Sequence, residues 1–210
     1  MTDTAAASTV PGGRIGALLL RPTEAWNRIA NVSAEDEKCL LIRYAVPLAA
    51  IGPIASLIGN QLVPMRIFGA VLRPSLTGAV TSAVVAWALA LVGVVVLALV
   101  IDALASPFGG IKDRRRAMQV AVYSSTASWL SGVFGILPAL MILSLVGLYS
   151  LFLLYKGLPI VMKTPADKAL GYTASVVVAA LVISVMTAVI AGGVASMFTA
   201  GSGIAGLGGI

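Results

Sequence analysis

The chain has 210 residues, of which 59% are hydrophobic and 10% are charged, and its formal net charge is +6. A soluble domain of this length cannot bury so much apolar surface in one core, so the composition excludes a soluble globular protein and predicts a membrane protein. Histidine is absent and Cys39 is the single cysteine, which excludes Ser-His and Cys-His catalysis, histidine-ligated metals and an intrachain disulfide. We therefore expect no enzymatic activity, no metal site and no cofactor.

The N-terminal region is predicted to lie on the membrane surface without crossing it. Residues 1–13 are small and polar without periodicity, which is typical of disorder. Residues 14–38 are predicted to form a cytoplasmic, interfacial amphipathic helical arm, with Pro22 at a helix start. Its apolar side chains, which we expect to face the bilayer, are Leu18, Leu19, Trp26 and Ile29, and its polar ones are Arg21, Asn27 and Arg28.

Five apolar segments follow, and together they make residues 39–200 a membrane domain. A helix needs about 20 apolar residues to cross a bilayer. The predicted spans are residues 40–60, 76–101, 118–137, 139–157 and 172–198, of which 139–157 is the weakest, and residues 201–210 form a Gly-rich tail. The expected fold is all-α: a polytopic transmembrane bundle of five helices with an N-terminal interfacial amphipathic helix.

Prolines and glycines predict two irregular places in this bundle. Pro47, Gly52 and Pro53 lie inside the first span, which we expect to be kinked or broken. Gly135 and Pro138 make the only break between the third and fourth spans, so these spans are expected to form a tight hairpin.

The basic residues are distributed unevenly among the connecting segments. One side of the predicted membrane holds twelve of them and the other holds two. The larger group is Arg14, Arg21, Arg28, Lys38, Arg43, Lys112, Arg114, Arg115, Arg116, Lys156, Lys163 and Lys168, and the smaller group is Arg66 and Arg73. Because basic loops stay cytoplasmic, this pattern predicts a cytoplasmic N-terminus and a C-terminus on the opposite side.

The same basic residues are candidates for contacts with lipid head groups or a partner protein. Anionic head groups attract each juxtamembrane basic residue with about 1 kcal/mol. The candidate contacts are Arg21, Trp26 and Arg28 in the arm, Lys112, Arg114, Arg115 and Arg116 in one loop, and Lys163 and Lys168 in another. A continuous basic face with stacking aromatic residues is not visible, which argues against a nucleic-acid partner.

Two further sets of residues are candidate sites within the spans. Arg43 and Asp102 are predicted at similar depth near the cytoplasmic side, where they form either a structural ion pair or a gate or proton site. The third span contains a polar stretch made of Tyr123, Ser124, Ser125, Thr126 and Ser128. These hydroxyl groups either line a solute path or bond to carbonyls of their own or a neighbouring helix.

Several motifs taken in order resemble a known family. They are LRPTEAW at 20–26, Tyr44 with PLAAIG at 47–52, PFGG at 107–110, YSST at 123–126, and LYSLFLLYKGLP at 148–159 continuing through MKTP at 162–165 to GYT at 171–173. Over residues 15–175 the chain resembles the bacterial branch of the Yip1 domain family. The resemblance implies a five-span membrane protein with a cytoplasmic N-terminus, in a bacterial inner membrane, and no catalytic residue is carried over from it. Eukaryotic relatives bind Rab-type GTPases, a partner that we do not expect here because the arm is short.

Two functions remain open at this point. The first is a non-enzymatic integral membrane protein that organises the membrane or binds an unidentified partner protein through its arm and loops. The alternative is a small-solute or ion transporter or channel, alone or as a homo-oligomer, which the irregular first span and the polar stretch favour. Against it, no inverted repeat is detectable and Asp102 is the single acidic residue near a span.

Overall fold

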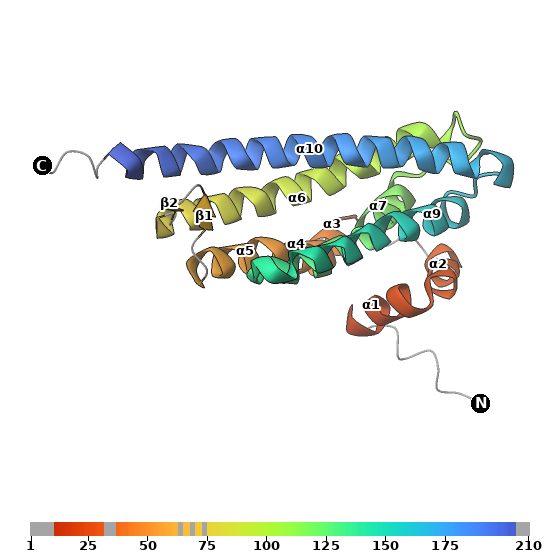
Figure 1. Ribbon diagram of the computed structural model, residues 1–210. Helices are drawn as coiled ribbons and strands as arrows, with labels where there is room; N and C mark the ends of the chain where they lie inside the picture. The colour runs from red at the N-terminus through yellow and green to blue at the C-terminus, as the bar shows by residue number, and fades with distance from the viewer. Residues whose placement is uncertain (1–10, 32–36, 63–64, 68–69, 73–74, 205–210) are drawn as a thin grey trace, which may run out of the picture.

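The computed structural model describes residues 11–31, 37–62, 65–67, 70–72 and 75–204. Helices dominate this part of the chain, which confirms the predicted all-α polytopic bundle (Figure 1). Four segments are long and apolar enough to cross a membrane: Lys38–Leu62, Leu76–Ala105, Ile142–Val161 and Ala166–Val194. The remaining predicted span, 118–137, is divided among shorter helices, so the count of five stays a prediction.

The arm consists of two helices, α1 (Pro11–Leu20) and α2 (Pro22–Asn31). Pro22 begins α2, as its fixed φ and missing N–H predicted. Arg21 joins the two helices, since its N–H donates to the carbonyl of Ala17 at 2.9 Å. Residues 11–13 are helical rather than disordered, and residues 1–10 lie outside the described part of the chain.

The first span keeps helical backbone along its length and contains a π-helical turn. It comprises α3 (Glu37–Leu40), the π-helical turn η2 (Leu41–Ala45), α4 (Val46–Ala49) and α5 (Ile51–Leu62). Pro47 lies in the first turn of α4, directly after the wider π turn, which is a common way for a helix to accommodate a proline. Ala50 keeps helical backbone angles, and its carbonyl accepts from Ile54 N at 3.0 Å. The prolines therefore do not separate the span into two unconnected helices.

A short β-hairpin follows the first span, and the sequence did not predict it. Strand β1 (Met65–Ile67) pairs antiparallel with β2 (Ala70–Leu72), with Arg66 opposite Val71. In Figure 1 the hairpin and the C-terminal end of α10 lie at one end of the molecule, and α2 lies at the other.

Two long helices, α6 (Leu76–Ala105) and α10 (Ala166–Ile204), run side by side along the bundle (Figure 1). Ser75 caps α6 by accepting from Gly78 N at 3.2 Å. Gly93 permits their close contact, because a methyl group there would lie 3.3 Å from Cγ2 of Ile183. Since α10 continues to Ile204, part of the predicted Gly-rich tail is helical.

The predicted third and fourth spans are built from five shorter segments. The third contains α7 (Arg114–Ser124), α8 (Thr126–Ser131) and the 3₁₀ helix η3 (Gly132–Ile136), and the fourth contains the 3₁₀ helix η4 (Pro138–Leu148) and α9 (Tyr149–Val161). Between them Leu137 has extended backbone, and η3 packs against η4. The two spans form the hairpin that Gly135 and Pro138 predicted.

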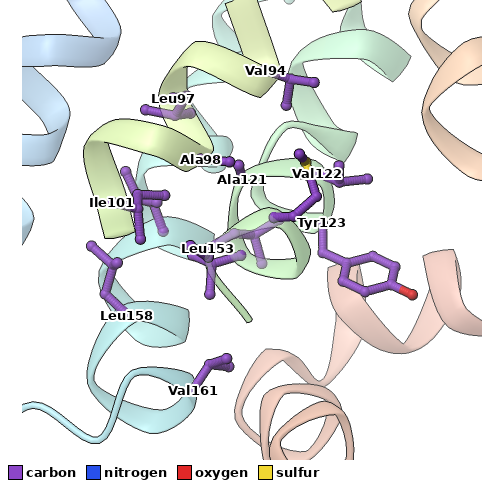
Figure 2. Packing of buried hydrophobic residues seen from close by; sticks show 14 of the residues in the cluster. Val94, Leu97, Ala98, Ile101, Ala121, Val122, Tyr123, Leu153, Leu158 and Val161 are labelled. Atoms are coloured by element: carbon purple, nitrogen blue, oxygen red, sulfur yellow. The ribbon is translucent and has the colours of Figure 1, made fainter. Parts of the chain in front are cut away.

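The core lies where α6, α7 and α9 meet. Figure 2 shows α6 contributing Val94, Leu97, Ala98 and Ile101, α7 contributing Ala121 and Val122, and α9 contributing Leu153, Leu158 and Val161. All of these side chains are buried. The ring of Tyr123 points away from Leu97 and Ile101, toward the N-terminal part of the chain (Figure 2).

Candidate functional site

Two loops meet at one end of the bundle. Residues 106–113 connect α6 to α7, and residues 162–165 connect α9 to α10. Ile111 N donates to the carbonyl of Met162 at 2.8 Å, which joins the two loops. Gly109 has a φ of +73°, and a methyl group there would lie 3.4 Å from the Pro165 ring. Glycine at this position allows both the left-handed backbone and the close approach of the loops. We call this region, with the adjoining residues 114–116 and 168, the basic end.

The basic end gathers predicted contact residues that are separate in the sequence. The exposed cations are Lys112, Arg114, Arg115, Lys163 and Lys168. A methyl group on Gly109 would lie 3.9 Å from Cδ of Lys168, so the side chain of that lysine lies against the 106–113 loop. Lys163 has a φ of +52°, a left-handed conformation that costs a non-glycine residue roughly 1–2 kcal/mol. The structure thus brings the two predicted loop clusters together on one surface.

Arg116 holds the arm against the basic end. Its Nη1 donates to the carbonyl of Ala30 in α2 at 3.0 Å, and its Nε lies 3.4 Å from Oδ2 of Asp113. Asp113 also caps α7 by accepting from the backbone N–H groups of Arg115 and Arg116. Arg116 is half-buried, so among the predicted cationic contacts it is a positioning residue for the arm.

The arm packs on the bundle through a buried tryptophan. The prediction that Trp26 and Leu18 face the bilayer surface is wrong, because both are fully buried within the protein. The Trp26 ring lies edge-on to Tyr123, with centroids 6.4 Å apart, and fills the space above Gly157 of α9. A methyl group on Gly157 would lie 2.7 Å from Cε2 of Trp26, so glycine is required there. Tyr149 adds a hydrogen bond of 3.0 Å to the carbonyl of Leu19.

The other predicted arm contacts remain on the surface. Arg21 and Arg28 are both exposed, and Arg21 lies 3.7 Å from the Glu24 carboxylate in an exposed ion pair. Such a pair contributes little to stability because water screens it. These two arginines are therefore accessible to head groups or a partner protein, whereas Trp26 is not.

The structure does not bring Arg43 and Asp102 into an ion pair. Arg43 is exposed on η2, and among the described residues none of its contacts is a salt bridge. Asp102 is partly buried near the end of α6, and its Oδ1 is buried without a hydrogen-bond partner in the described part of the chain. The two residues therefore occupy different surroundings.

The polar stretch of the third span divides between two faces. Tyr123 and Thr126 face the N-terminal helices, where Thr126 Oγ1 and the Tyr44 hydroxyl share a hydrogen bond of 2.9 Å. The rings of Tyr44 and Tyr123 meet edge-on with centroids 5.0 Å apart. This half of the stretch is packed solid, because Tyr44, Tyr123 and Thr126 are all buried.

Ser124 and Ser128, on the other face, line a cavity of about 580 Å³. The cavity lies between α6, α8, η4, α9 and α10, with Ser125 and Ser131 on the same wall. Sequence reasoning missed its opposite wall, which contains Ser184 and Thr187 of α10. Hydroxyl residues spaced three or four apart on one helix are the signal that predicted the first wall. Ser184 and Thr187 show the same three-residue spacing on α10, so the signal was present there too but was not used.

One of three comparisons with known proteins gives a match. The profile of the Yip1 domain matches residues 16–205, which include most of the arm, all four candidate spans and both loops of the basic end. Neither the comparison with curated proteins nor the one with solved structures gives a match.

Proposed function

Because the chain belongs to the Yip1 domain family, we propose that this multi-pass membrane protein is non-enzymatic and organises the membrane or binds a partner protein at its basic end. The charge pattern supports a location of this end on the cytoplasmic side of a bacterial inner membrane, with the C-terminus on the opposite side. Five spans give that orientation, with 118–137 crossing as a broken helix.

The proposal rests on the way in which the arm and the two loops are fixed to one another. Arg116 bonds to the arm at Ala30, and Ile111 bonds to the second loop at Met162. These contacts hold the exposed cations of three separate segments in one arrangement. A surface that is ordered before it binds loses less entropy on binding, which favours the use of the basic end as a docking surface.

The partners that suit this surface are anionic. Lipid head groups with a phosphate are the first candidates, because the cations border the apolar spans. A partner protein with an acidic surface is the second, and a homo-oligomer in which two basic ends share anionic lipids is the third. Nucleic acid lacks a stacking platform here, since the aromatic residues of this region are mostly buried.

The test uses the full chain in nanodiscs that contain phosphatidylcholine and phosphatidylglycerol. We would neutralise Lys112, Lys163 and Lys168 together to glutamine and measure by native mass spectrometry how much phosphatidylglycerol is retained. At about 1 kcal/mol per basic residue, the preference for the anionic lipid should fall by up to roughly a hundredfold. Arg66→Gln at the opposite end is the matched control and should change little. Unchanged retention in the triple variant would overturn the proposal that the basic end docks anionic lipids.

The cavity favours one alternative function, a transporter or channel for small solutes or ions. Flux of neutral and charged solutes into proteoliposomes tests it, with Asp102→Asn and Ser128→Ala as variants. Measurable flux that either variant abolishes would favour this alternative over the docking function. Flux equal to that of empty liposomes would exclude it.

A further inference from the structure

We propose that the serine-lined cavity is a binding site for a neutral glycerolipid with a free hydroxyl group, of the diacylglycerol class. The cavity is formed by residues 89–97 of α6 and 180–191 of α10 on one side, and by α8, η4 and α9 on the other. These stretches lie near the middle of the long helices. The site is therefore at membrane depth and separate from the basic end.

The hydrogen bonds that the lining hydroxyl groups already make indicate which kind of ligand fits the cavity. Four of the serine hydroxyls already donate to carbonyls of their own helix: Ser124 and Ser125 to Ala121 at 3.2 and 2.8 Å, Ser128 to Ser125 at 2.9 Å, and Ser131 to Ser128 at 2.8 Å. Ser184 on the opposite wall donates in the same way to Ala180 at 2.8 Å. A hydroxyl that donates its hydrogen keeps oxygen lone pairs for accepting. These five hydroxyl groups therefore keep acceptor capacity, and a ligand that donates hydrogen bonds fits them.

The lack of charged residues in the described cavity lining further limits the class of ligand. None of the cavity-lining residues that the structure describes is charged. A phosphate or ammonium group would lose its hydration there without gaining a counter-charge, which is costly. A hydroxyl group loses much less, and its donor finds the acceptors of the serine wall. Neutral lipids with a free hydroxyl are thus favoured over phospholipids.

The cavity opens toward the hydrocarbon phase of the membrane, which favours a lipid over a water-soluble solute as its ligand. Its inner wall is closed by the buried side chains of Val94, Leu97 and Leu154. Its rim contains Leu145, Leu148 and Leu181, whose side chains are more than half exposed on the outer, apolar surface of the bundle. A molecule therefore reaches the cavity sideways from the hydrocarbon phase. The volume of about 580 Å³ falls in the range of roughly 300–1,000 Å³ that is usual for ligand pockets.

The first experiment changes the lipid and leaves the protein as it is. We would compare a photoactivatable diacylglycerol with its 3-O-methyl ether, which has the same chains but no hydroxyl donor, for cross-linking to the full chain in nanodiscs. We expect the diacylglycerol to label the residues of the cavity about fivefold more efficiently, since one lost hydrogen bond is worth about 1 kcal/mol. Equal labelling by the two lipids, or labelling outside the cavity, would overturn the proposal.

The second experiment changes the protein in matched pairs. Ala188→Phe fills the cavity from its α10 wall and should abolish the labelling, whereas Ala174→Phe, also exposed on α10 but not lining the cavity, should not. Ser131→Ala with Ser184→Ala should lower labelling several-fold, and Ser175→Ala, which removes a similar hydroxyl bonded to Gly171 outside the cavity, is the control. A cysteine cross-link between two copies at position 188 that excludes the lipid would assign the cavity to an oligomer interface instead.

Discussion

Helices α7 and α10 show opposite relations between polarity and burial. Helix α7 begins with three arginines and contains Gln119, yet every residue from 117 to 124 is buried. Helix α10 is far more apolar over its membrane segment, but its large side chains, among them Val178, Leu181 and Val185, are mostly exposed. Of these two helices, the apolar one thus lies outside and the polar one lies at the centre.

This difference indicates what holds a membrane bundle together. Lipid chains are as apolar as leucine, so apolarity alone does not drive one helix against another. Helix α7 is buried because small residues, edge-on aromatic rings and hydrogen bonds let α2, α6 and α9 approach it closely. We therefore expect substitutions around α7 to affect stability strongly and those on the lipid face of α10 to affect it weakly.

The largest expected effect is that of Trp26→Ala, which removes the ring that packs between Tyr123 and Gly157. Emptying this site should lower the free energy of unfolding by about 3–5 kcal/mol, as for other buried aromatic residues. Unfolding by sodium dodecyl sulfate in mixed micelles measures it. Val185→Ala on α10 is the control, for which we expect a change within about 0.5 kcal/mol. Similar losses in both variants would contradict the contrast between α7 and α10.

The next effect concerns the contact between α5 and η3. A methyl group on Gly132 would lie 2.6 Å from Cα of Gly52, so Gly132→Ala must push two backbones apart and should cost about 1–3 kcal/mol. The reciprocal Gly52→Ala places its methyl group at 3.7 Å and should be tolerated. Gly192→Ala on α10 meets nothing within 4 Å and should be neutral or stabilising by up to about 1 kcal/mol. If Gly192→Ala were as harmful as Gly132→Ala, the argument from close approach would fail.

Sequence reasoning predicted the features that depend on local composition. The lengths of the apolar segments predicted the ends of the four candidate spans to within four residues, except that the last span begins six residues earlier than predicted. The charges of the loops predicted the cations that the structure brings together at the basic end. The sequence could not predict the burial of Trp26, for a physical reason. An amphipathic helix shows that it faces an apolar surface, but a bilayer and a groove beside Gly157 are both apolar. Only the tertiary structure distinguishes them.

The polar stretch shows the same limit at finer scale. Helical spacing places Tyr123 with Thr126 and Ser124 with Ser128, so the division into two faces follows from the sequence. Which face is packed and which borders a cavity depends on Tyr44 and on α10, whose positions the local sequence does not specify. The turn at Ser125, which separates α7 from α8, also could not be predicted, because no proline or glycine lies beside it.

The third effect is that of Thr126→Val, on the buried face that Thr126 shares with Tyr123. Valine has nearly the same shape but cannot form the buried hydrogen bond with Tyr44, so the free energy of unfolding should fall by about 1–2 kcal/mol. Thr81→Val on α6 is the matched control, because its exposed hydroxyl only bonds to the carbonyl of Thr77 on its own helix. Equal changes in both variants would show that the Tyr44–Thr126 bond contributes nothing specific to the α7 region.

The smallest expected effect has the opposite sign and concerns Lys163 at the basic end. At a φ of +52° glycine avoids the strain that a Cβ creates, although its greater freedom in the unfolded chain offsets part of the gain. Lys163→Gly should therefore leave the free energy of unfolding unchanged or raise it by up to about 1 kcal/mol, while retention of phosphatidylglycerol falls. Lys163→Ala, which keeps the strain and removes the same charge, should lower lipid retention equally without the gain in stability. A Lys163→Gly variant that binds phosphatidylglycerol normally would remove this residue from the docking surface.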